Sequence, residues 1–143
     1  MAAITLFSIS VTAQNNWKTR ATNGKLIEAP KLTVITTTNA TATHVDSIVI
    51  ADNTAGIITI EGVGAVPTTG KAITGVLVYR YSKSAGTLTI GTVTSVVAIV
   101  ADTEVSGGTF ALAATASNNA QLKATGKAST TVRWRFNVFQ TPH

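Results

Sequence analysis

The side chains best suited to acid–base chemistry are few in this sequence, and they do not form a catalytic set. The two histidines are His44 and His143, and His143 is the last residue. His44 precedes Asp46 by two positions, and residues so spaced share one face of a strand, so their side chains could touch. A serine or metal mechanism needs a further partner held in place by its neighbours. We therefore predict no catalytic residue and no metal site.

Paired carboxylates are the second chemistry to consider, because glycoside hydrolysis uses two of them. Asp102 and Glu104 flank Thr103 near a Gly-Gly loop. No acidic pair in the sequence is accompanied by the aromatic residues that usually line a sugar-binding cleft. We expect the chain not to be an enzyme and to bind no cofactor. The six acidic residues are Glu28, Asp46, Asp52, Glu61, Asp102 and Glu104.

Cationic side chains are concentrated in the second half of the chain. Residues 1–70 carry no net charge, so residues 71–143 account for the net charge of +5. A sheet that binds single-stranded nucleic acid presents basic and aromatic side chains on the same face. In VLVYRYSK and TVRWRFNV the arginines alternate with Tyr, Trp and Phe and therefore point the opposite way. We predict that Arg80, Arg133 and Arg135 contact water or a neighbouring subunit, and nucleic acid is not an expected partner.

The elements that position these residues are predicted to be strands. Hydrophobic residues recur with a period of two in most of the chain, and turn signals such as ADNTAG, VPTTGK and SKSAG separate the alternating segments. No long segment shows the spacing of a helix. We predict an all-β fold, an antiparallel β-sandwich or jelly-roll-like architecture with little or no helix. The alternating segments are GIITIEGVGAV, AITGVLVYRY, GTLTIGTV, TFALAATA, AQLKATG and TTVRWRFNVF.

The predicted faces of these strands define a core and an exposed side. Alternation places Trp134 and Phe136 in the core and turns Arg133, Arg135 and Asn137 towards water or a neighbouring subunit. The same pattern assigns Ile58, Ile60, Ile73, Leu77, Tyr79, Tyr81, Val132 and Val138 to the dry face.

Length and composition indicate a single domain over residues 1–143. Only 12% of the residues are charged, and such a surface is often covered by copies of the same chain or by a partner. Cysteine is absent, which excludes disulfides, and no segment approaches the length of a membrane span.

The start, MAAITLFSISVTAQNN, alternates as a strand does and lacks the basic region of a secretion signal, so we predict a native strand there.

The N-terminal third is the least clear part of the chain. The Thr-rich segment TVITTTNATATHV fits either a long strand pair or an extended arm that becomes ordered in an assembly. We therefore treat residues 1–43 as a candidate N-terminal arm or attachment segment and residues 44–143 as the β-sandwich core.

Three segments together resemble a known class of proteins: DNTAGIITIEGVGAV, YRYSKSAGTLTIGT and NNAQLKATGKASTTVRWRFNVFQ. In that order they are similar to the β-rich terminal domains of tailed-bacteriophage fibre and related virion structural proteins. The resemblance covers about residues 45–140, and the first 40 residues match nothing in that class. The chain departs from the pattern at Ala128 and Ser129, where a glycine is usual before the Thr pair. The matching positions include Asn118, Asn119, Gly126, Thr131, Arg133 and Trp134.

The resemblance implies a β-sandwich that forms a homotrimer on a virion. We therefore expect a non-enzymatic phage structural protein, either a capsid decoration subunit or a fibre-head module. Its expected partners are other copies of itself and other virion proteins. The alternative is a receptor- or glycan-binding adhesin module, for which the partner is a host-surface glycan.

Overall fold

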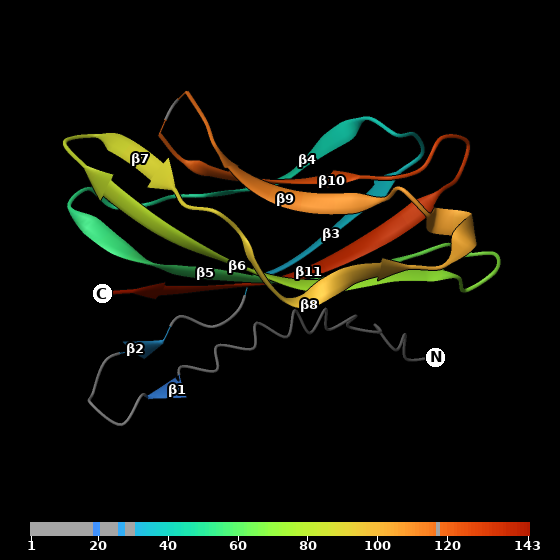
Figure 1. The fold of residues 1–143 in the computed structure, drawn as a ribbon, viewed down its shortest axis with the longest axis horizontal. Helices are drawn as coiled ribbons and strands as arrows, with labels where there is room; N and C mark the ends of the chain where they lie inside the picture. The colour runs from blue at the N-terminus through green and yellow to red at the C-terminus, as the bar shows by residue number, and fades with distance from the viewer. Residues whose placement is uncertain (1–18, 21–25, 28–30, 117) are drawn as a thin grey trace, which may run out of the picture.

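The computed structural model describes residues 19–20, 26–27, 31–116 and 118–143 (Figure 1). The strand predicted at the start of the chain lies outside these residues. In the described part, two antiparallel sheets form the two layers of a β-sandwich, as predicted (Figure 1). The 3₁₀ turn η1 (Thr103–Val105) is the one helical element among these residues. No helix in this part of the chain has the length and hydropathy needed to cross a bilayer.

The larger sheet contains six strands within the described residues, in the order β3-β11-β5-β6-β7, with β8 also paired to β6. They are β3 (Lys31–Thr37), β11 (Val132–Pro142), β5 (Thr54–Ala65), β6 (Ala72–Ser84), β7 (Thr87–Ile90) and β8 (Thr94–Ala101).

The smaller sheet covers one face of the larger one and has the order β4-β10-β9 (Figure 1). Its strands are β4 (Ala42–Ile48), β10 (Ala120–Thr125) and β9 (Thr109–Ala114). A separate antiparallel pair joins β1 (Thr19–Arg20) and β2 (Leu26–Ile27).

The core lies between the two layers because alternation sends every second side chain inward. Trp134 and Phe136 are 1% and 0% exposed, while Arg133 and Arg135 beside them are exposed. The predicted assignment of faces is therefore confirmed for β11. It is also confirmed for β5 and β6, where the predicted core residues Ile58, Ile60, Ile73, Leu77, Tyr79 and Tyr81 are all buried.

An aromatic cluster fills the centre of the sandwich. The rings of Trp134 and Phe136 stack with centroids 5.7 Å apart. Phe110, from the opposite sheet, meets Phe136 edge-on at 5.4 Å. Gly62 leaves room for this contact, because a Cβ at that position would lie 2.6 Å from the Phe110 ring. A glycine in the middle of β5 therefore serves the packing of rings between the sheets.

The resemblance leads us to expect a glycine in the turn where Ala128 and Ser129 stand, and this turn has a residue of positive φ at Ser129. Its φ is +59°, in the left-handed region that glycine adopts most easily. The short turn Lys127–Thr130 is closed by a backbone hydrogen bond of 3.2 Å from Thr130 N–H to Lys127 O. The turn thus keeps a conformation typical of glycine although serine stands there.

The Thr-rich segment forms two strands that belong to different sheets. β3 pairs with β11 from Lys31 to Thr37, whereas β4 pairs with β10 in the other layer. Of the two alternatives left open for this segment, a strand pair is not formed, because the two strands pair with β11 and β10 and not with each other. The predicted boundary after residue 43 falls inside β4. Because β3 is built into the larger sheet, an arm that separates from the core would have to end before Lys31, and the existence of such an arm stays a prediction.

Candidate functional site

The outer face of the larger sheet points away from the smaller sheet and carries the predicted arginines. In the register of β3, β11 and β5, Arg135 lies between Val34 and Val63. Leu32 and Val34 are 57% and 62% exposed, and Val63 is 47% exposed. We call these residues the arginine face: Leu32, Val34, Val63, Arg133 and Arg135. It combines exposed aliphatic side chains with two guanidinium groups on the same three strands.

A shallow hollow of about 450 Å³ lies in the arginine face. Val34 and Val63 line it together with Arg133, Arg135 and the small side chain of Ala65. Arg133 and Arg135 are two positions apart on β11, so their Cα atoms are separated by roughly 7 Å along the strand. A surface of this kind suits an apolar group of a partner that carries hydrogen-bond acceptors at its rim.

Arg80 lies apart from the other two arginines. Its side chain lies on the same outer face as that of Arg135. Thr74 of β6 pairs with Val63, which lies beside Arg135, and Arg80 is an even number of positions further along β6 and so points the same way. Six positions of β6 separate Arg80 from Thr74, which corresponds to roughly 20 Å. The structure therefore brings Arg133 and Arg135 together and places the third predicted arginine elsewhere on the face.

Four carboxylates of the described residues accept hydrogen bonds from groups other than the arginines. Asp52 accepts a hydrogen bond of 2.9 Å from Gly86 N–H, and Asp102 accepts one of 2.8 Å from Ala72 N–H. Glu104 and Glu61 accept from Thr69 and Asn137 at 2.8 and 3.2 Å. The guanidinium groups of Arg133 and Arg135 make no hydrogen bond or ion pair to any residue that the structure describes. Their charges remain available to a partner outside this part of the chain.

His44 and Asp46 could touch in a regular strand, but a bulge in β4 turns their side chains apart. Asp46 faces Leu122 of β10, but His44 faces the next residue, Lys123. One extra residue in β4 therefore turns the two side chains to opposite faces of the sheet. His44 Nε2 lies 3.1 Å from Ser47 Oγ instead. Over the residues that the structure describes, no group of three or more His, Asp or Glu side chains could hold a metal ion.

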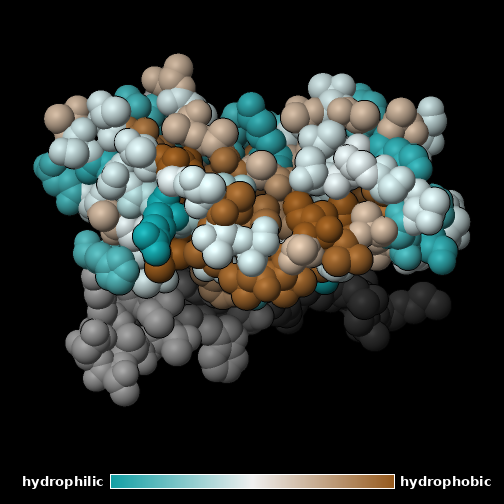
Figure 2. Space-filling view, viewed as in Figure 1, coloured by the Kyte–Doolittle hydropathy of each residue, from teal (hydrophilic) through white to brown (hydrophobic). Residues whose placement is uncertain are grey.

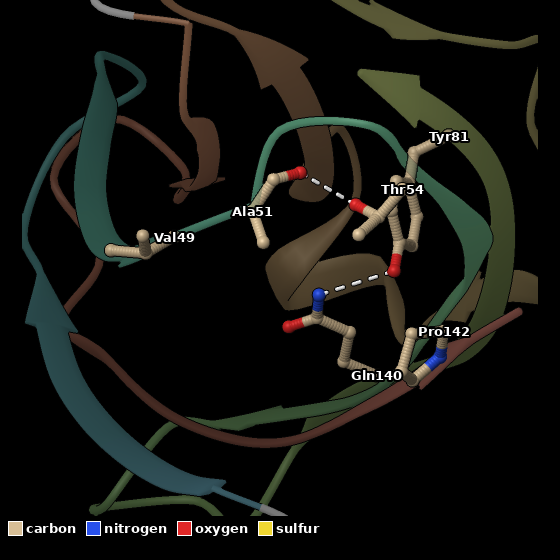
Figure 3. Close-up of a pocket in the computed structure, with 6 residues that line it drawn as sticks. All are labelled: Val49, Ala51, Thr54, Tyr81, Gln140 and Pro142. Atoms are coloured by element: carbon tan, nitrogen blue, oxygen red, sulfur yellow. Dashed lines mark hydrogen bonds between the residues drawn. The ribbon is translucent and has the colours of Figure 1, made fainter. Parts of the chain in front are cut away.

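A second hollow, of about 270 Å³, lies at the end of the sandwich where the β4–β5 loop meets the last residues of β11 (Figure 3). The Gln140 amide donates a hydrogen bond of 3.2 Å to the Tyr81 hydroxyl, and Thr54 Oγ1 donates one of 2.6 Å to Ala51 O. Val49 and Pro142 complete the lining (Figure 3). These polar groups bond to one another, and the lining contains neither a general base nor an acid, so the hollow has no evident chemistry.

A third hollow, of about 460 Å³, lies where the β5–β6 and β10–β11 turns meet η1. Glu104, Arg133 and several hydroxyl groups line it, the hydroxyls being those of Thr68, Ser129, Thr130 and Thr131. It is the one hollow among those described in which a carboxylate and a guanidinium face the same space. Such a lining can bind a polar ligand through hydrogen bonds.

Comparison with known proteins adds little to this geometry. No family model and no curated protein matches the chain. Among solved structures, the chain is similar to a tailspike protein, gp49 from the Acinetobacter baumannii bacteriophage Fri1, described as a capsular polysaccharide depolymerase. The similarity has a TM-score of 0.41 at 12% sequence identity and covers 76% of this chain. The chain spans 17% of the length of that tailspike chain.

Proposed function

We propose that this protein is a non-enzymatic structural module of a phage virion, of the fibre-head or capsid-decoration type, that assembles as a homotrimer through its arginine face. The observation that carries the proposal is the exposure of Leu32, Val34 and Val63 on one side of the larger sheet. Exposed aliphatic side chains that surround arginine on one face are a combination found at protein–protein interfaces. The trimeric state and the location on a virion are inferred from the resemblance to phage fibre and virion domains.

Charge on the arginine face favours contact with polar acceptors of a neighbouring copy. A second copy brings the same net charge of +5, so a close contact requires the guanidinium groups to meet oxygen atoms. Backbone and hydroxyl oxygens of the strands provide them, and arginine is enriched at interfaces for this reason. Arg133 and Arg135 then hydrogen-bond across the subunit boundary while the valines and Leu32 exclude water.

A receptor- or glycan-binding module is the alternative function. The observation in its favour is the hollow lined by Glu104, Arg133 and four hydroxyl-bearing residues, since sugars are bound through such hydrogen bonds. No aromatic side chain lines this hollow to stack on a sugar ring. We therefore rank glycan binding below assembly.

The mass of the purified protein in solution tests the proposal. Wild-type protein at micromolar concentration should have a mass that is a multiple of three monomers of 14.7 kDa. Leu32→Lys places a charge on the arginine face opposite the neutral Asn137 and should lower the mass to one third. Val49→Lys is the matched control, because Val49 is 73% exposed and lies on a loop away from this face. A glycan-array signal from protein that stays monomeric would instead support the alternative.

A further inference from the structure

Glu61 is the one acidic residue on the strands of the larger sheet within the described part of the chain. It lies on β5 between Asn137 of β11 and Val76 of β6. Its side chain is exposed, whereas Ile60 before it is buried. Because every second residue of a strand points the same way, Glu61 projects from the same outer face as Val63, which belongs to the arginine face.

Glu61 and Arg135 occupy neighbouring rows of this face on adjacent strands. Arg135 pairs with Val63, and Asn137 pairs with Glu61, so the two rows are roughly 7 Å apart. Within one chain Glu61 accepts a hydrogen bond of 3.2 Å from the Asn137 amide rather than from the Arg135 guanidinium. No described residue bonds to the second oxygen of the Glu61 carboxylate. The face therefore carries a cation and an anion that both retain bonding capacity.

The exposed apolar residues of β8 offer no charge that could meet Arg135 from a second copy. Val96, Val97 and Val100 are 66%, 48% and 63% exposed, and hydrophobic residues gather over this strand in the space-filling view (Figure 2). The strand itself contains no charged residue. The other described side-chain carboxylates lie outside the strands of the larger sheet. Glu61 is therefore the carboxylate best placed to meet an arginine face.

We propose that Glu61 of one copy forms an ion pair with Arg135 of the next copy in the trimer, so that each of the three boundaries contains the same pair. This inference rests on the proposed function, because it needs assembly through the arginine face. In a closed ring of three, each boundary joins two different parts of the surface, and Arg135 and Glu61 are two such parts of opposite charge. Copies that each carry a net charge of +5 repel one another, and the pair provides attraction where they touch.

Exposed aliphatic neighbours favour this pair. Val34 and Val63 flank Arg135 in the register of the sheet, and they are 62% and 47% exposed. When a second copy covers them, they exclude water from around the guanidinium, and attraction between opposite charges is stronger where water is excluded. The pair also determines how neighbouring copies are aligned, because a displaced copy would leave both charges without a partner.

Charge-reversal variants test the pair through the mass of the protein at micromolar concentration. Glu61→Arg brings two guanidinium groups together at each boundary, and Arg135→Glu brings two carboxylates together, so each variant alone should have one third of the wild-type mass. The variant that combines both substitutions restores opposite charges and should regain the wild-type mass. A purely structural role of the two residues would not give this rescue, because the damage from the two substitutions would then accumulate.

Arg80→Glu is the matched control. Arg80 lies on the same outer face, roughly 20 Å along β6 from the row of Arg135, and its reversal changes the net charge as Arg135→Glu does. Arg80→Glu alone should keep the wild-type mass. Combined with Glu61→Arg it should stay at one third of that mass, although this variant has the same net charge as the rescued one.

Thermal melts show whether each variant folds. If a reversed variant does not fold, Glu61→Gln and Arg135→Gln replace it, and the measured quantity is the protein concentration at which the assembly dissociates. Each single substitution should raise this concentration at least tenfold. The double variant should raise it no further, because the first substitution has already removed the pair.

Two results would overturn the pairing and leave the proposed function standing. One is a wild-type trimer whose mass is unchanged by both charge reversals, and the other is a combined variant that stays at one third of the wild-type mass. Fully additive effects of the two glutamine substitutions would also overturn it. A wild-type protein of monomer mass would instead contradict the proposed function, and the pairing with it.

Discussion

The indole Nε1 of Trp134 donates a hydrogen bond of 2.9 Å to the hydroxyl of Thr37, which joins the centre of β11 to the end of β3 inside the core. Thr37 is 2% exposed and is the one buried polar residue of the described core. Gly126 packs directly on the Thr37 hydroxyl, so a side chain there would collide with it. This contact makes β3 part of the core rather than a separable strand.

Thr37→Val should destabilise the protein by about 1–3 kcal/mol, because it removes the acceptor and leaves the buried indole N–H without a partner. Valine has nearly the shape of threonine, so packing changes little. Thr36→Val is the matched control: Thr36 is exposed on the same strand, and its substitution should change the stability by less than about 0.5 kcal/mol. Equal unfolding free energies for the two variants in urea titrations would contradict the role given to the hydrogen bond.

Trp134→Ala should cost roughly 3–5 kcal/mol, the range for removal of a large buried aromatic side chain. Arg135→Ala should cost less than about 1 kcal/mol in the isolated subunit, because the guanidinium is exposed and has no described partner. A large loss of stability for Arg135→Ala, together with a lower oligomer mass, would show that this arginine is paired across a subunit boundary. A Trp134→Ala variant that melts like wild type would show that the aromatic cluster does not stabilise the sandwich.

Gly62→Ala should destabilise the sandwich by about 1–3 kcal/mol, although alanine is less costly than glycine in a strand. The added methyl group would lie within 3 Å of the rings of Phe110 and Phe136 and would force the two sheets apart. Gly91→Ala is the control, since a Cβ there would make ordinary contact at 3.5 Å with Arg80 O. Thermal melts should show a lower Tm for the first variant and no comparable loss for the second.

Brief proteolysis should leave a resistant core that begins at or before Lys31. The reason is that β3 pairs with β11 over its whole length and ends in the buried Thr37 contact. N-terminal sequencing of the resistant fragment provides the measurement. A stable fragment that starts after Thr37 would mean that β3 detaches from the sheet without loss of the core.

The faces of the long strands could be predicted from the sequence because alternation reports burial directly. In TTVRWRFNVF polar and apolar residues alternate from Thr131 to Val138, and the structure buries Val132, Trp134, Phe136 and Val138 as predicted. The ends of these strands could also be predicted from the turn residues. Gly70 and Gly86, which have positive φ, lie in the turns that separate β5 from β6 and β6 from β7.

Other features leave no signal in a single sequence. The bulge in β4 adds one residue without a change of composition, so the opposite orientations of His44 and Asp46 could not be foreseen. The exposure of strand β8 could not be predicted, because an apolar run has the same pattern whether a neighbour covers it or not. The separation of Arg80 from Arg135 depends on the pairing register of three strands, which the turns determine.

Light scattering of wild-type protein and Leu32→Lys at micromolar concentration is the measurement that tests the central claim most directly. The account predicts a wild-type mass that is a multiple of three monomers of 14.7 kDa, and a threefold lower mass for Leu32→Lys with Val49→Lys unchanged. A wild-type mass of 14.7 kDa, or a Leu32→Lys variant with the wild-type mass, would contradict assembly through the arginine face.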